Sequence, residues 1–154
     1  MALEPIREVA SDNARERTLA AFLEQHMGWE LFPTPRFFFV DFHILKLFDN
    51  GRKNYIGDLE IKWLKIDSSY PAIFPFNKLQ QMLIAPPYTD SPDSFHRVCI
   101  RYTDGLMMIP VKELAHLKPE LHTRKDTNET DLVIKIYAKD YAKYFRNFVI
   151  EEPS

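Results

Sequence analysis

The segment DFHILKLFDNGRKNYIGDLEIK, residues 41–62, decides the fold class that we expect for this chain. At its centre, Asn50-Gly51 is typical of a tight turn, because both residues tolerate the positive φ values of a two-residue type I′ hairpin. Apolar and polar side chains alternate just before this turn. We therefore expect two antiparallel strands, Phe37 to Phe48 and Lys53 to Ile66, joined by the turn.

The expected turn also sets which residues lie opposite each other. A two-residue loop pairs Asp49 with Arg52, and residue-for-residue pairing from there brings Asp41 opposite Glu60. A bulge at Gly57 would shift this register. Lys62 shares their face, because side chains alternate with a period of two. Two opposed carboxylates repel each other, so a plain surface would not favour this arrangement. A divalent metal would resolve the repulsion, since Mg²⁺ takes carboxylate oxygens, waters and substrate phosphates as ligands.

Helices and further strands are expected on both sides of this hairpin. In chain order these are a helix at Ser11 to Met27, a strand at Trp29 to Phe32, a short helix capped by Asn77, strands at Arg97 to Tyr102 and Leu106 to Val111, a polar loop at Lys112 to Asp131, a strand at Leu132 to Tyr137 and a helix at Lys139 to Phe148. This order predicts an α/β fold in one domain, residues 1–154.

Composition excludes several classes of protein. The 154 residues are 45% hydrophobic and 27% charged, which is ordinary for a globular domain. No apolar run approaches the length of a membrane span, and the first residues lack a signal-peptide pattern. The sequence therefore predicts an intracellular, cytoplasmic protein with no membrane partner.

Scarce residue types exclude several kinds of site. Cys99 is the only cysteine, so neither an internal disulfide nor a cysteine-rich zinc site can form. The four glycines are too dispersed for a nucleotide-binding loop. The net charge of −2 argues against a generally basic nucleic-acid coat, although a local basic patch stays open.

Asp41 and Glu60-Ile61-Lys62, on a hairpin with a helix before and after it, resemble the PD-(D/E)XK nuclease superfamily. Restriction enzymes and phage recombination nucleases belong to this superfamily. The resemblance covers the chain from about Ser11 to Tyr102, although Val40 stands where many members have a proline. It implies a restriction-endonuclease-like mixed sheet flanked by helices, with an αβββαβ core, in a protein of phage or microbial type.

The same resemblance implies roles for these residues. Asp41 and Glu60 would bind Mg²⁺ or Mn²⁺, the Ile61 carbonyl would add a ligand, and Lys62 would assist the attacking water. Some members add an acidic residue from the first helix, which makes Glu16 a further metal-ligand candidate.

Other positions are weaker candidates for the site. Asp58 shares the face of Glu60 and could be an accessory metal ligand, and Lys78 could approach a phosphate. His43 could bind the site or be structural. Arg97 and Arg101 share a strand face and could contact a nucleic-acid backbone.

The favoured function is Mg²⁺-dependent hydrolysis of nucleic acid, with DNA as the first choice of substrate. The alternative is a catalytically inactive nuclease-fold protein that binds nucleic acid or a protein. A third option is an interaction protein whose acidic hairpin is only solvated surface. The chain has little room for a separate recognition domain, so a second subunit in a homodimer or a protein partner could assist binding.

Overall fold

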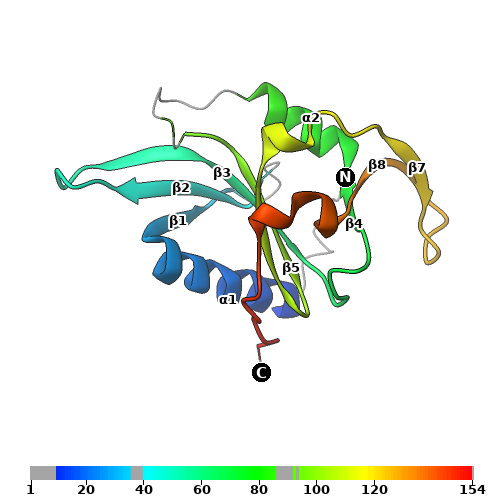
Figure 1. Ribbon diagram of the computed structural model, residues 1–154, viewed down its shortest axis with the longest axis horizontal. Coiled ribbons are helices and arrows are strands. Elements are labelled where there is room, and N and C mark those ends of the chain that lie inside the picture. The colour runs from blue at the N-terminus through cyan, green and yellow to red at the C-terminus, as the bar shows by residue number, and fades with distance from the viewer. Residues whose placement is uncertain (1–9, 36–39, 86–91, 93, 154) are drawn as a thin grey trace.

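The computed structural model describes residues 10–35, 40–85, 92 and 94–153, and within these it contains two sheets (Figure 1). The six-stranded sheet has the order β1-β2-β3-β5-β6-β9, and the three-stranded sheet has the order β4-β8-β7. The expected α/β class is therefore confirmed. Over the same residues, no helix combines the length and the apolar character that crossing a membrane requires.

The large sheet is mixed, because β3 and β5 run parallel while its other neighbours are antiparallel. Its strands are β1 (Trp29–Pro33), β2 (Phe42–Leu47), β3 (Lys53–Trp63), β5 (Arg97–Tyr102), β6 (Gly105–Pro110) and β9 (Phe145–Arg146). The small sheet contains β4 (Ala72–Pro75), β7 (Glu120–Thr123) and β8 (Thr130–Ile136). The helical elements are α1 (Ala10–Met27), α2 (Phe76–Ile84) and the 3₁₀ segments η2 (Val111–Leu114) and η3 (Ala138–Tyr144).

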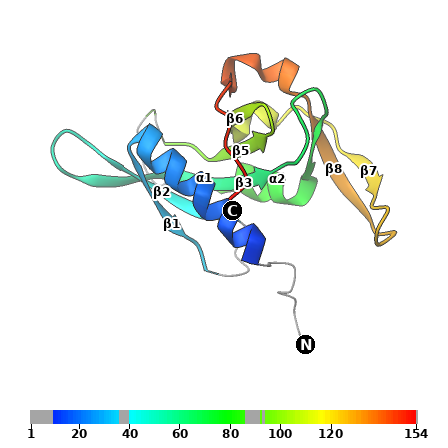
Figure 2. The ribbon, with the colours of Figure 1, turned by 90° about the horizontal axis from the view of Figure 1, so that it is seen from below.

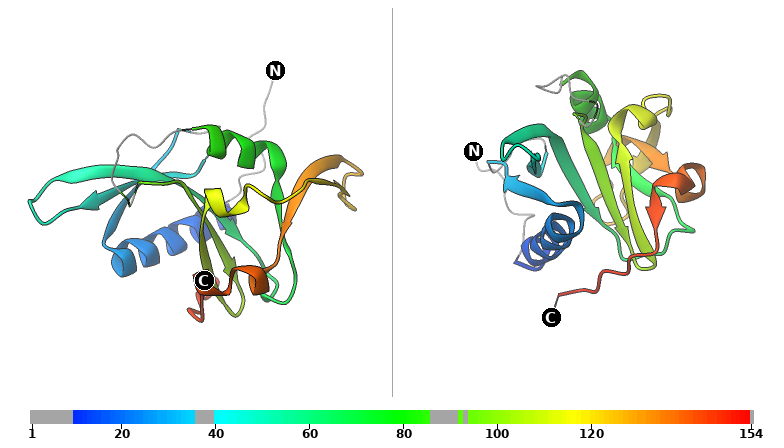
Figure 3. Two further views of the ribbon diagram at one scale, coloured as in Figure 1. Left: turned by 45° about the horizontal axis from the view of Figure 1, so that its top comes forward. Right: turned by 60° about the vertical axis from the view of Figure 1, so that its left-hand side comes forward.

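Helix α1 lies against one face of the large sheet, and α2 with the small sheet lies on the other (Figure 2, Figure 3). Leu59 and Ile61 of β3 pack in the same apolar cluster as Leu19 of α1. Because side chains alternate along a strand, Glu60 and Lys62 point to the opposite face, toward α2. The fold thus separates an apolar α1 side of β3 from a charged α2 side.

The β2–β3 hairpin has a different turn from the expected one. Phe48 N donates to the Arg52 carbonyl and Gly51 N donates to the Phe48 carbonyl, so the loop comprises the three residues 49–51. Gly51 supplies the positive φ of 83° that such a loop needs. The prediction of a two-residue turn at Asn50-Gly51 is therefore wrong.

A β-bulge at Ile56 nevertheless restores the expected pairing at the far end of the hairpin. Leu45 lies opposite Tyr55 but Ile44 lies opposite Gly57, so β3 contains one extra residue there. Phe42 then pairs with Leu59. Without the bulge, the strand would slip by one residue and reverse the faces of its side chains.

Three other expectations differ from the structure. The segment from Lys112 to Asp131 is not one polar loop, because it contains η2, β7 and the start of β8. The expected helix at Lys139 to Phe148 is instead η3 followed by β9. Helix α2 begins at Phe76 after Pro75 without a side-chain cap, so Asn77 is not its N-cap. The expected strand start at Phe37 lies outside the described residues.

Substitution of Gly57 should test the bulge. Gly57 has a φ of 135°, and a Cβ atom there would overlap the Phe95 carbonyl oxygen. We expect Gly57→Ala to lower the free energy of unfolding by at least about 3 kcal/mol in urea denaturation. Gly51→Ala is the control, because a Cβ at Gly51 would meet no atom within 4 Å. It should cost only about 1 kcal/mol, and equal losses in the two variants would contradict this account of the bulge.

Candidate functional site

Asp41 and Glu60 lie side by side where β2 begins and β3 approaches its end. Asp41 N donates to the Leu59 carbonyl at 3.2 Å, which holds Asp41 beside β3 just before the first paired residue of β2, Phe42. The Asp41 Oδ2 atom accepts a hydrogen bond from Ile61 N at 2.7 Å. Since the N–H and C=O of one strand residue point to the same side, the Ile61 carbonyl also faces this edge.

Glu60 is a buried carboxylic acid with one unsatisfied oxygen. Its residue is only 7% exposed, and its Oε2 atom accepts a hydrogen bond from Lys78 Nζ at 2.8 Å. Its Oε1 atom is buried and receives no hydrogen bond from an N–H or O–H donor among the described residues, while the Glu60 side chain makes a hydrogen bond with that of Asp41. Burial raises the pKa of Glu60 to about 8, with a further rise from the Asp41 charge and an opposing effect from Lys78. Without a metal, Glu60 therefore holds a proton below about pH 8, and a bound cation would take the place of that proton.

Lys62 completes the group on the α2 side of β3. Burial lowers the pKa of its ammonium, while Glu60 opposes that change, and Lys78 and Arg124 lower the pKa further. Lys62 thus lies within electrostatic range of Glu60, Lys78 and Arg124. The three residues predicted as catalytic, Asp41, Glu60 and Lys62, occupy one end of β3 and its neighbouring strand.

The donor set suits a metal that keeps much of its own water. Over the described residues, no group of three or more His, Cys, Asp or Glu side chains is arranged to hold a metal ion. Mg²⁺ is commonly bound by one or two carboxylates, with waters and substrate phosphate completing its shell. Asp41, the orphaned Oε1 atom of Glu60 and the Ile61 carbonyl fit that requirement.

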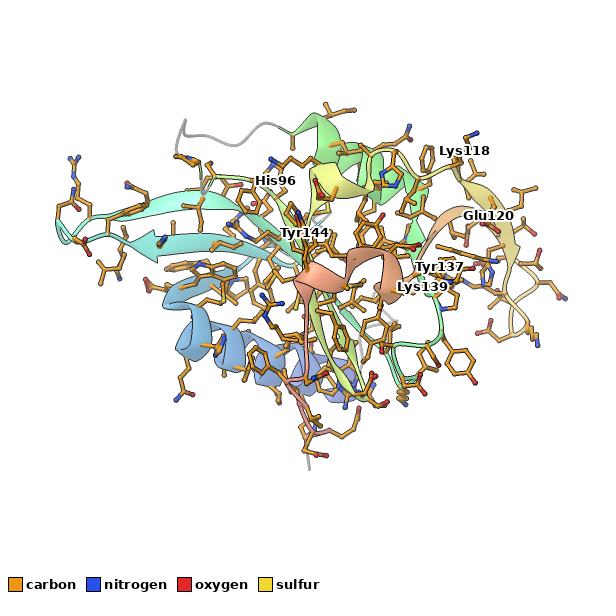
Figure 4. The ribbon with its side chains drawn as sticks, in the orientation of Figure 1. His96, Lys118, Glu120, Tyr137, Lys139 and Tyr144 are labelled. Carbon is orange, nitrogen blue, oxygen red and sulfur yellow. The ribbon has the colours of Figure 1, made fainter. Side chains whose placement is uncertain are left out.

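Asp58 lies on the same face but is already engaged. It pairs with His43 across the hairpin, and its Oδ1 atom lies 2.7 Å from His43 Nδ1 and accepts a hydrogen bond from Tyr55 at 2.5 Å. Its backbone N donates to Nδ1 of His96, which precedes β5 and lies beside β3 (Figure 4). These contacts occupy Oδ1 and the backbone N–H, whereas Oδ2 makes no hydrogen bond with the described residues and lies 3.8 Å from His96 Nδ1. The role of Asp58 as an accessory metal ligand stays a prediction.

Lys78 lies at the site, whereas Glu16 lies on α1. Glu16 is half-buried in α1, which packs on β1 and β3, and its role as a further ligand stays a prediction. Lys78 lies at the site, because it binds Glu60, and its side chain is still 30% exposed. Its contact with a nucleic-acid phosphate also stays a prediction.

Arg97 and Arg101 lie on the other side of the sheet. They pair with Leu59 and Trp63 of β3, so they share the α1 face and not the face of Glu60. Both are buried, at 6% and 4% exposure. This placement does not support the prediction that they contact a nucleic-acid backbone.

The guanidinium groups of both arginines form hydrogen bonds and ring contacts within the protein. Arg97 donates to the Phe95 carbonyl at 2.8 Å and stacks over the Phe95 ring. Arg101 donates to the carbonyls of Leu64 and Ile150, which attaches the C-terminal segment to the sheet. Sequence spacing correctly placed both on one strand face but could not tell which face it was.

Residues outside the predicted set also contribute to this part of the molecule. His96 donates from Nε2 to the Ala85 carbonyl and accepts the Asp58 N–H at Nδ1, so it joins the end of α2 to β3. His122 and Arg124 line a groove that reaches Lys62. These links join distant segments, and no local sequence signal indicates them.

Comparison of the chain with protein-family models, curated proteins and solved structures gives no match. The geometry of the site is thus the basis for a functional assignment. A close carboxylate pair beside a half-buried lysine can hold a hard divalent cation and act on a phosphate ester.

Glu60 should make the metal-free protein less stable as pH rises. Its folded-state pKa is raised from 4.5 to about 8, so between these values the folded protein binds more protons than the unfolded chain. The free energy of unfolding should therefore fall between about pH 5 and pH 8 and then level off. In Glu60→Gln this fall should be smaller by a few kcal/mol, because the titrating group is absent.

Urea denaturation with a chelator present measures this difference. Asp126→Asn, at an exposed position in the β7–β8 turn, is the control and should follow the parent protein. Parallel curves for the parent and Glu60→Gln would show that the buried carboxyl does not titrate as proposed.

Proposed function

We propose that this chain hydrolyses phosphodiester bonds in nucleic acid with Mg²⁺ or Mn²⁺, at a site formed by Asp41, Glu60 and Lys62. One observation carries the proposal: the Glu60 Oε1 atom is buried without an N–H or O–H donor from the described residues, next to a second carboxyl with which it can interact favourably only through a shared proton or a cation. Such an oxygen costs free energy unless a proton or cation satisfies it. A metal ion would satisfy it, together with Asp41.

The chain topology supports a restriction-endonuclease-like fold. The large sheet and the helices beside it follow the order α1, β1, β2, β3, α2, β5, and β5 runs parallel to β3. This corresponds to the αβββαβ core that the resemblance implies. Asp41 precedes β2 and Glu60 lies near the end of β3, which are the places that the nuclease motif requires.

Each residue has a distinct role in the proposed reaction. The bound metal would lower the pKa of a water and neutralise charge on the scissile phosphate. Ile61 N orients the Asp41 carboxylate through its hydrogen bond. Lys62 would hold the attacking water and stabilise negative charge that develops on the phosphate. Lys78 fixes one oxygen of Glu60 and leaves the other available.

The Lys78–Glu60 ion pair also favours a second candidate function. An ammonium at 2.8 Å from the Glu60 carboxylate partly satisfies the charge that a metal would otherwise neutralise. A nuclease-fold protein that binds nucleic acid without cutting it could keep this pair permanently. Metal binding separates the two functions, because the inactive protein would have no reason to bind Mg²⁺ at this site.

Divalent metal should raise the thermal midpoint of the parent protein by several degrees at saturation, because it binds only the folded site. Asp41→Asn should abolish most of this rise, whereas Asp49→Asn, in the exposed hairpin turn, should retain it. Calorimetric scans with and without Mn²⁺ measure both variants. A thermal midpoint that does not change with metal, or that rises as much in Asp41→Asn as in the parent protein, would count against the site.

Substitutions of Glu60 and Lys62 should affect metal binding and cleavage differently. Glu60→Gln removes a charged ligand, so metal affinity and cleavage should fall together. Lys62→Ala leaves both carboxylates and removes a nearby cation, so metal binding should persist while cleavage falls at least about a hundredfold. Calorimetric metal titration and a cleavage assay on single-stranded, double-stranded and branched DNA and on RNA give both readouts. A Lys62→Ala protein that cuts like the parent would refute the assigned mechanism.

A further inference from the structure

A groove of about 630 Å³ runs from Lys62 toward the β7–β8 hairpin. One side consists of the start of α2, with Phe76, Asn77 and Gln80. The opposite side includes His122 of β7 and Arg124, which follows it. Figure 1 shows this hairpin projecting from the body beyond α2, and Glu120 marks the first residue of β7 in Figure 4. The groove therefore begins at a proposed catalytic residue and leads away from it.

The cationic groups of the groove suit phosphate. Within the described part of the chain, Lys62 forms no ion pair, and the Arg124 side chain is 42% exposed. Arg124 Nε lies 3.7 Å from Asp131 Oδ2, which is beyond ordinary hydrogen-bond distance and leaves its guanidinium donors available. The groove thus offers two cations against the single carboxylate of Asp131.

Neutral groups in the same groove suit nucleotides. The ring of His122 can stack on a base, and the amides of Asn77 and Gln80 can form hydrogen bonds with base edges or sugars. The first turn of α2 has no side-chain cap, so its backbone N–H groups add donors beside the cations. Cations interspersed with rings are typical of grooves that bind single strands.

The size of the groove favours a single strand of nucleic acid over a duplex. A volume of about 630 Å³ is comparable with sites for drug-sized ligands. It can hold a short single-stranded segment but not a duplex. We propose that this groove binds the single-stranded part of the substrate next to the scissile phosphate, with Arg124 contacting its backbone. This inference rests on the proposed nuclease function and names its substrate class.

Binding measured without metal tests the groove independently of cleavage. Fluorescence anisotropy with a chelator would compare a labelled single-stranded DNA oligonucleotide with a hairpin duplex of the same length. Arg124→Gln should weaken single-strand binding about fivefold or more, and should reduce the slope of log K against log salt by about 0.7. Lys125→Gln is the matched control, because Lys125 is the exposed neighbour in the same turn and does not line the groove.

The outcomes separate this inference from the proposed function. Tighter binding of the single strand than of the duplex, lost in Arg124→Gln but not in Lys125→Gln, would support the groove even if the protein cut nothing. Equal weakening by both substitutions, preference for the duplex, or no binding of the oligonucleotide would overturn it. Metal-dependent cleavage that persists unchanged in Arg124→Gln would leave the nuclease proposal in place but would rule out the proposed role of the groove in binding substrate.

Discussion

Two carboxyl groups held together on a buried strand face are the constraint around which this structure is arranged. Glu60 is buried beside Asp41, and both burial and the neighbouring charge raise its pKa. Its surroundings offset part of the cost: Lys78 from α2 binds one Glu60 oxygen, and the Ile61 N–H binds Asp41. The remaining Glu60 oxygen receives no N–H or O–H donor from the described residues, and the hydrogen bond between the Glu60 and Asp41 side chains requires a proton between the two carboxyls. The fold thus tolerates an incompletely satisfied site, which is typical of positions kept for function.

The position of this pair was predictable from the sequence, although the predicted reason was incomplete. The apolar alternation around Phe42 and Leu59 indicates their pairing, because any other register would put charge into the α1 core. The predicted two-residue turn was one residue too short, and the bulge near Gly57 compensates for that difference. An isolated glycine inside a strand is a local signal for such a bulge, but the close approach of the Gly57 backbone to Phe95 joins distant segments and has no local sequence signal.

The face that β5 presents and the pairing of strands in the small sheet could not be predicted. Arg97 and Arg101 have the correct spacing for one strand face, but only the parallel pairing with β3 shows that this face is opposite to Glu60. Strand β8 coincides closely with the expected strand at Leu132 to Tyr137. Strand β7 arises from a polar segment with little periodicity, and its cross-strand pairs with β8, which also pairs with β4, stabilise it. His122 and Arg124 therefore join the neighbourhood of Lys62 only through tertiary structure.

The central claim is that Asp41 and Glu60 together hold a divalent metal ion. Anomalous X-ray diffraction from crystals soaked in Mn²⁺ tests it most directly, because the manganese signal locates the ion without reference to activity. The account predicts one strong peak within coordination distance of both carboxylates, and no such peak in crystals of Asp41→Asn. A peak elsewhere, or an unchanged Lys78–Glu60 ion pair with no peak beside it in saturating Mn²⁺, would contradict the account.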